Sequence, residues 1–163
     1  MIIRTRIIEP EYIMLAFRLN YRRPWRIFAT VLGALILMYA LYSAANDYYF
    51  PTRHFIFGIV FVFLIPVLIY IRAKKSYAAN LRLQEEIEYE FTDDRMLQRA
   101  TSFTSERDWS RTYKIEEVKN FFLIYESSAT FNIIPHSSLT PEEVNQLRYI
   151  LHHIQTGAIK KLK

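Results

Sequence analysis

Residues 27–45 read IFATVLGALILMYALYSAA and residues 55–71 read FIFGIVFVFLIPVLIYI, and neither stretch contains a charged side chain. A helix rises about 1.5 Å per residue, so roughly 20 residues cross a hydrocarbon core of about 30 Å. His54 and Arg72 flank the second run, where they can reach the membrane surface. We predict two transmembrane helices, because a chain of 163 residues is too short to bury both runs in a soluble core.

The segment between the runs, residues 46–54 (NDYYFPTRH), is short and contains Asn, Asp and Pro, which favour turns. It predicts a tight antiparallel hairpin with both ends on one side of the membrane. Basic residues flank the hairpin on that side, whereas the linker carries only Arg53. By the positive-inside rule, we expect a two-pass protein of the cell inner (plasma) membrane with both termini in the cytoplasm.

Basic and aromatic residues near the ends of the two runs are the candidate interface and topology residues. Aromatic rings prefer the headgroup level of the bilayer, and cations set the orientation of the helices. A cationic collar of this kind also suits anionic lipid, so a lipid-sensing role is an alternative. These residues are Arg22, Arg23, Trp25, Arg26, Tyr48, Tyr49, Arg72, Lys74 and Lys75.

Small and polar residues inside the runs bear on how the helices pack. Ala29 and Gly33 have the spacing that lets helices approach closely, and we expect them to face the second helix, although a dimer face has the same pattern. Pro66 interrupts the second run, as in some transporters. Transport also requires polar groups inside the membrane, and the runs offer Thr30 and Ser43. A subunit of an oligomeric transporter or channel is therefore the weaker alternative.

The two halves of the chain carry opposite net charge. Residues 1–83 contain 11 basic and 3 acidic residues, a net charge of +8, whereas residues 84–163 contain 10 basic and 13 acidic residues, a net charge of −3. The second half would repel a phosphate backbone, so we expect no binding of nucleic acid. The absence of cysteine excludes disulfides and thiolate sites, and three glycines are too few for the common nucleotide-binding loops.

After the second run the pattern changes to that of a small sheet. Residues 86–91 (EIEYEF) alternate carboxylates with apolar side chains, as in a strand with one wet face. Further strands are predicted at residues 96–103, 107–113 around the tryptophan, 120–125 and 130–134, joined as an antiparallel meander. A strand is also predicted at residues 2–8. Thr140, Pro141 and Glu143 then form the start signal of an amphipathic helix.

Two stretches of the second half resemble a known family. They are EYEFTDDRMLQRATSF (residues 88–103) and WSRTYKIEEVKNFFLIYESSATFNIIPHSSLTPEEVNQLRYIL (residues 109–151), which look like the C-terminal region of YcxB-like membrane proteins of bacteria. The resemblance implies two transmembrane helices followed by a domain similar to bacterial pleckstrin-homology-like (PH-like) domains. It leaves the activity open. Residues 92–95 (TDDR) are acidic where related eukaryotic domains carry a basic phosphate-binding loop, so reading of phosphoinositides there is not expected.

We therefore predict a membrane α-helical hairpin plus an α+β domain, with a PH-like antiparallel sheet or partial barrel of about five strands and a C-terminal helix. The expected parts are residues 1–24, a strand and a short helix; 25–72, the hairpin; and 73–163, the cytoplasmic domain. We expect a non-enzymatic, membrane-anchored protein without cofactor or metal, whose domain binds a protein partner or a second copy of the chain. The candidate partner surface is Trp109, Phe121, Phe122 and Tyr125.

Overall fold

The computed structural model describes residues 1–46 and 51–162. The chain divides into two compact units, one formed by residues 9–79 and the other by residues 1–8 together with 80–163. The boundaries predicted at residues 24 and 72 differ from this division, because residues 2–5 pair with a strand of the sheet and the second long helix continues to Ala79. Each unit is described below by itself.

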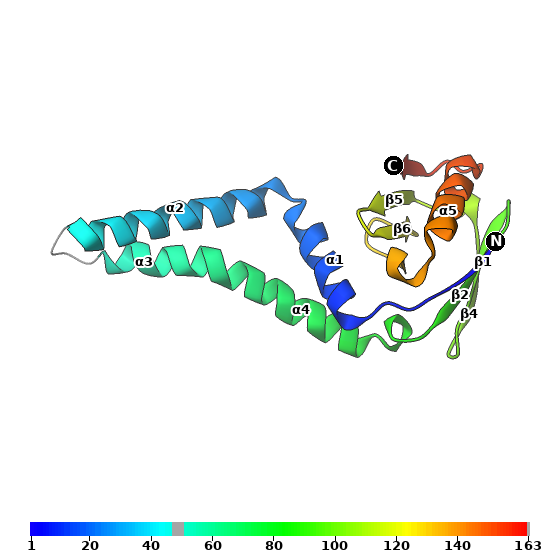
Figure 1. Ribbon diagram of the computed structural model, residues 1–163, viewed down its shortest axis with the longest axis horizontal. Helices are drawn as coiled ribbons and strands as arrows, with labels where there is room; N and C mark the ends of the chain where they lie inside the picture. The colour runs from blue at the N-terminus through cyan, green and yellow to red at the C-terminus, as the bar shows by residue number, and fades with distance from the viewer. Residues whose placement is uncertain (47–50, 163) are drawn as a thin grey trace. The chain divides into compact units, whose positions relative to one another are not determined.

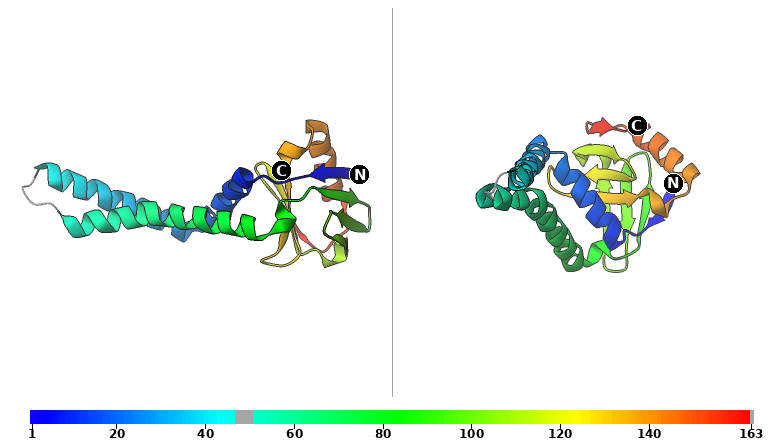
Figure 2. Two further views of the ribbon diagram at one scale, coloured as in Figure 1. Left: turned by 90° about the horizontal axis from the view of Figure 1, so that it is seen from below. Right: turned by 60° about the vertical axis from the view of Figure 1, so that its left-hand side comes forward.

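The first unit is helical and is dominated by a long hairpin (Figures 1 and 2). Helix α1 (Glu9–Tyr21) is the short helix predicted within residues 1–24. It begins with acidic residues and Pro10 in its first turn, because acids and Pro suit a helix N-terminus. Helix α2 (Pro24–Asn46) then runs beside a second continuous helical stretch. That stretch consists of α3 (Thr52–Ile59), the π-helical turn η1 (Val60–Leu64) and α4 (Ile65–Ala79).

The π-helical turn lies immediately before Pro66. Proline has no backbone N–H and its ring collides with the carbonyl group four residues earlier, here that of Val62. A π turn changes the hydrogen-bond spacing at this point, which lets the helix continue past the proline. The predicted interruption at Pro66 is therefore a local widening of the helix.

Small residues bring the two long helices together. A β-carbon added to Gly33 would lie 2.5 Å from the Cβ atom of Phe61, and one added to Gly58 would lie 2.9 Å from the Cα atom of Leu37. Ala29 and Ala40 are also buried. The expectation that Ala29 and Gly33 lie on the inner face of the hairpin is confirmed.

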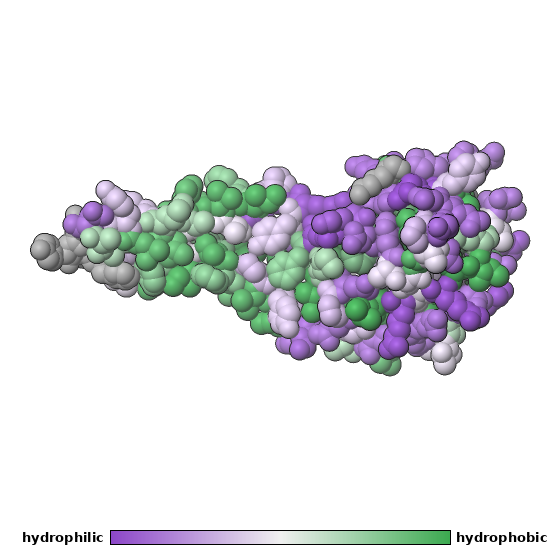
Figure 3. All heavy atoms as spheres, in the orientation of Figure 1, coloured by the Kyte–Doolittle hydropathy of each residue, from purple (hydrophilic) through white to green (hydrophobic). Residues whose placement is uncertain are grey.

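Both long helices have the length and composition of membrane spans, over Pro24–Asn46 and Thr52–Ala79. Their large apolar side chains point outward, so that hydrophobic residues cover the hairpin in Figure 3. Of the most apolar 18-residue window, 17% is buried in the first helix and 11% in the second. This is the reverse of a core helix in a soluble protein, whose apolar residues are mostly buried.

The second unit contains two four-stranded sheets, in the orders β1-β2-β3-β4 and β7-β6-β5-β8. Neighbouring strands are antiparallel except β5 and β8, which are parallel. Helix α5 (Pro141–His153) follows β7. The strands are β1 (Ile2–Thr5), β2 (Ile87–Phe91), β3 (Arg95–Arg99), β4 (Thr104–Asp108), β5 (Lys114–Val118), β6 (Phe121–Tyr125), β7 (Phe131–Pro135) and β8 (Ile159–Lys161).

One hydrophobic core joins the two sheets and the helix. Phe91 of the first sheet and Ile124 of the second are both in the core cluster, together with Leu147 and Leu151 of α5. The start of α5 is the predicted capping box: the Thr140 hydroxyl accepts a hydrogen bond from the Glu143 backbone nitrogen at 3.2 Å, and the Glu143 carboxylate accepts one from the Thr140 nitrogen at 2.8 Å. The C-terminal helix is confirmed.

Three features of the predicted sheet are wrong. Residues 1–46 and 51–162 contain two sheets of four strands each and no closed barrel, where one antiparallel sheet or partial barrel of about five strands was expected. The strand predicted over residues 107–113 ends at Asp108, because Trp109 begins a 3₁₀ turn, η3 (Trp109–Arg111). Residues 114–118, expected to be a connection, form β5, whose carboxylates at Glu116 and Glu117 are buried and paired with cations.

Candidate functional site

The predicted membrane-surface residues lie at the open end of the hairpin. Arg22 and Arg23 lie between α1 and α2, and Trp25 and Arg26 are in the first turn of α2. The basic residues Arg72, Lys74 and Lys75 are in the second half of α4. All are exposed except Arg26, which is half-buried. Tyr48 and Tyr49 lie outside the described residues.

Three of these arginines, Arg23, Arg26 and Arg72, line one cavity of about 540 Å³, which we call the arginine pocket. Helix α4 forms one wall, and α1 and the start of α2 supply the others. The remaining lining residues are Tyr12, Ala16, Asn20, Trp25, Ile65, Leu68, Ile69, Ala73 and Ser76. No carboxylate of the described residues lines the pocket, so its charge is positive.

The polar groups on the α1 side of the pocket are already paired. The Tyr12 hydroxyl and the Ser76 hydroxyl are 3.0 Å apart, and the Asn20 amide donates to the Ala16 carbonyl at 2.7 Å. The guanidinium of Arg26 is different, because its Nη1 atom is buried and makes no hydrogen bond within the described structure. A buried cationic donor without a partner is unusual in proteins.

The pocket could not be located from the sequence. The cations were predicted from their positions beside the apolar runs. These positions indicate the orientation of the helices in the membrane, but not that three of the side chains line one pocket. Tyr12 and Asn20 were not predicted as site residues, since they belong to α1, whose docking against α4 depends on tertiary packing. The contact between the Tyr12 and Tyr77 rings, 5.8 Å apart, marks this docking.

Three of the four residues of the predicted partner surface are buried. The side chains of Trp109, Phe121 and Phe122 are 1%, 1% and 0% exposed, and Tyr125 is half-buried beside the ring of Phe131 at 5.0 Å. A run of consecutive apolar residues, such as the FFLIY of β6, is typical of a strand that is buried on both faces. The buried Phe121 and Phe122 side chains therefore stabilise the fold.

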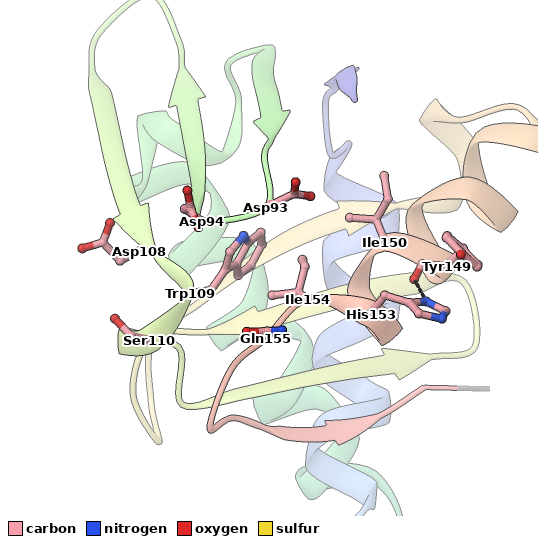
Figure 4. Close-up of a pocket in the computed structure, with 10 residues that line it drawn as sticks. All are labelled: Asp93, Asp94, Asp108, Trp109, Ser110, Tyr149, Ile150, His153, Ile154 and Gln155. Atoms are coloured by element: carbon pink, nitrogen blue, oxygen red, sulfur yellow. Dashed lines mark hydrogen bonds between the residues drawn. The ribbon is translucent and has the colours of Figure 1, made fainter.

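A second cavity, of about 750 Å³, lies on the sheet unit and is called here the acidic groove. One side is the β2–β3 turn and the η3 turn, and the other is the end of α5 (Figure 4). Its lining residues are Asp93, Asp94, Asp108, Trp109, Ser110, Tyr149, Ile150, His153, Ile154 and Gln155. The core tryptophan thus reaches the floor of a surface groove.

The three carboxylates of the groove do not converge. In Figure 4, Asp93 points across the groove toward Ile150 of α5, whereas Asp108 points away from the helix. Within the part of the chain that the structure describes, no cluster of three metal-binding side chains occurs. The groove is suited to spread-out contacts with a cationic surface rather than to a metal ion.

The other charged groups around the groove are engaged in local contacts. The Arg95 side chain donates to Glu106, and this hydrogen bond is the main reason that the pKa of Arg95 is raised, with smaller contributions from the carboxylates of Asp108 and Asp94. The Nδ1 atom of His153 lies 2.8 Å from the carbonyl oxygen of Tyr149, and its ring lies on the tyrosine ring at 4.1 Å. The charged groups of the groove that are available for a partner are therefore the aspartate side chains.

Comparison with known proteins gives one match. Residues 91–151 match the model of the family described as YcxB-like protein. Neither the curated proteins nor the solved structures contain a match to the chain. The matched segment runs from the last residue of β2 to Leu151, two residues before the end of α5. It includes every lining residue of the acidic groove except His153, Ile154 and Gln155. The resemblance noted in the sequence is confirmed over these residues, which are similar to the YcxB-like family.

Proposed function

We propose that the protein is a non-enzymatic, membrane-anchored module whose YcxB-like domain binds a partner protein through the acidic groove. The hairpin is the anchor, inserted in the inner (plasma) membrane of a bacterial cell. Both termini and the YcxB-like domain lie in the cytoplasm. The two parts of this proposal rest on different observations.

The outward-facing apolar surface of the hairpin supports the anchor. Water would be in contact with most of the large side chains of α2, α3 and α4 if the hairpin were not covered. Exposed apolar area costs about 25 cal/mol per Å², so an apolar medium is the favoured surrounding for this unit. The cations at its open end support a cytoplasmic location of the termini by the positive-inside rule.

A relationship to PH-like domains is also proposed, at the level of architecture. Its support is a core enclosed by two small sheets and one helix that follows β7. The turn at residues 92–95 carries Asp93 and Asp94 in the wall of the acidic groove, so this face is suited to cations rather than phosphates.

The observation that carries the protein-binding role is the combination of charge and apolar area in the acidic groove. Asp93, Asp94 and Asp108 give it a negative rim, while Ile150, Ile154 and the 64% exposed Tyr149 offer apolar contact. Aromatic residues flanked by charge are typical of protein interfaces. The complementary partner is a segment that has Lys or Arg residues beside an apolar side chain.

The test is photo-crosslinking from the groove in living cells. A photoreactive phenylalanine analogue replaces Tyr149 in the full-length protein, and the cross-linked peptide is identified by mass spectrometry. We expect a peptide that contains Lys or Arg, and we expect the double variant Asp93→Lys, Asp94→Lys to abolish the adduct. The matched control is Glu86→Lys, which reverses an exposed carboxylate outside the groove.

Two results count against the proposal: no adduct in the wild-type background, or an adduct that persists in the double variant. An adduct between two copies of the chain would identify the partner as the protein itself. Transport remains the weaker alternative, since the Thr30 hydroxyl inside the hairpin donates to the Arg26 carbonyl at 2.9 Å and so serves its own helix.

A further inference from the structure

We propose that the arginine pocket binds the phosphate of an anionic membrane lipid, with the headgroup held by Arg23, Arg26 and Arg72. The inference rests on the membrane anchor proposed above, since the anchor is what would bring lipid to the pocket. It concerns a different surface and a different ligand from the acidic groove.

Positive charge without internal neutralisation is the first argument. Lys74, also in the basic half of α4, lies 3.9 Å from Glu9, but none of the three pocket arginines has an ion-pair partner among the described residues. Guanidinium groups bind phosphate oxygens through paired, charge-assisted hydrogen bonds. Three guanidinium groups around one cavity form a site for a phosphate group, and no acidic side chain of the described residues occupies this site.

The buried Nη1 atom of Arg26 is the second argument, and it is independent of net charge. Cations that serve topology alone extend into water, as the exposed Lys75 does. Arg26 instead keeps a guanidinium nitrogen out of water with no acceptor in the described structure. A phosphate in the pocket, which this side chain lines, would supply that acceptor.

The lining of the pocket matches the two-part chemistry of a lipid. Ile65, Leu68 and Ile69 provide an apolar wall toward the hairpin, while Trp25, 69% exposed, lies among the arginines. Tryptophan prefers the level of the headgroups, and basic pockets between membrane helices bind anionic headgroups. A soluble phosphate ester would use the arginines but leave the apolar wall uncovered, so lipid is the favoured source.

The experiment uses the position of Trp25 in the pocket. The chain has two tryptophans, so the variant Trp109→Phe leaves Trp25 as the only indole fluorophore. Full-length protein in mild detergent is titrated with brominated phosphatidylglycerol, and quenching of Trp25 reports binding. Native mass spectrometry of retained phosphatidylglycerol, on protein that keeps Trp109, gives a second measurement if the Trp109→Phe variant does not fold.

We expect phosphatidylglycerol to bind more tightly than brominated phosphatidylcholine. Arg26→Gln and Arg72→Gln should each weaken its binding about tenfold, as expected for the loss of a charge-assisted hydrogen bond. The control Lys75→Gln removes a neighbouring exposed charge outside the pocket and should change binding less than about twofold. Equal binding of both lipids, or affinities unchanged by Arg26→Gln and Arg72→Gln, would overturn the inference.

Two further experiments distinguish lipid from a soluble phosphate ester, and a failure of the arginine pocket from a failure of the membrane anchor. If glycerol 3-phosphate displaces the brominated lipid, the arginines recognise phosphate but lipid is not the favoured source. Alkaline carbonate extraction of cell membranes tests the anchor alone: release of the wild-type protein contradicts the proposed function. Retention in the membrane without lipid preference contradicts only the arginine pocket.

Discussion

The hairpin has small side chains inside and large apolar side chains outside, whereas the sheet unit has large apolar side chains inside. In the hairpin, the inner face is made of Gly33, Gly58 and alanines, and the large apolar side chains point outward. In the sheet unit, Trp109 and Phe122 are inside and the surface is mainly hydrophilic (Figure 3). Burial of apolar area away from water holds the sheet unit together, whereas close backbone packing holds the hairpin.

This contrast teaches that the two units depend on different surroundings. The sheet unit needs water outside and a filled core inside. The hairpin gains little from mutual burial of large side chains, so its stability depends on small residues at the contact and on an apolar medium around it. Substitutions that damage one unit should therefore leave the other intact, and three predictions follow from this, in decreasing order of effect.

Trp109→Ala should have the largest effect, and only in the sheet unit. The indole is buried, its ring lies 6.2 Å from that of Phe91, and its Nε1 atom donates to the Thr92 carbonyl at 2.9 Å. Truncating such a side chain costs about 3–5 kcal/mol. Limited proteolysis of the full-length protein should show cleavage within residues 80–163, while the protein stays in the membrane fraction. Loss from the membrane fraction would mean that the units do not fold separately.

Gly58→Ala should produce the converse effect. The new methyl group would lie 2.8 Å from the Cβ atom of Leu37 and 2.9 Å from its Cα atom, so backbone has to move. Overpacking of this kind costs about 1–3 kcal/mol. We expect the hairpin to melt at a lower temperature in detergent. One cysteine is placed on α2 and one on α3, and the loss of their cross-linking with rising temperature measures the melting. Ala45→Leu, at an exposed position of α2, is the control and should leave cross-linking unchanged.

Lys119→Gly should have the smallest effect, and of opposite sign. Lys119 lies in the two-residue turn between β5 and β6 with a φ of 52°, a conformation that favours glycine. Removing the β-carbon should raise the free energy of unfolding of the sheet unit by up to about 1 kcal/mol. Thermal unfolding followed by circular dichroism measures the shift. An unchanged or lower melting temperature would show that the gain in chain entropy of the unfolded state outweighs the relief of strain.

Elements with strong local signals were predictable from the sequence. The two apolar runs became α2 and the α3-η1-α4 stretch, and the Thr140 capping box begins α5 where expected. Strand β5 was missed because its sequence KIEEV contains two carboxylates that look exposed. Their cations are revealed by the structure: the Lys114 amine is 2.6 Å from Glu116, and the Arg148 guanidinium is 2.7 Å from Glu117. One of these partners is 31 residues away in the chain, on α5.

Read alone, the sequence already shows which segments are apolar enough to span a membrane, where the cations gather, and that residues 91–151 resemble the YcxB-like family. These properties are set by composition and local pattern. Tertiary structure alone decided that Trp109 is a core residue, that β1 joins the sheet of β2, and that Arg23, Arg26 and Arg72 face one cavity. The physical reason is that convergence and burial depend on contacts between residues far apart in the chain, which no local periodicity encodes.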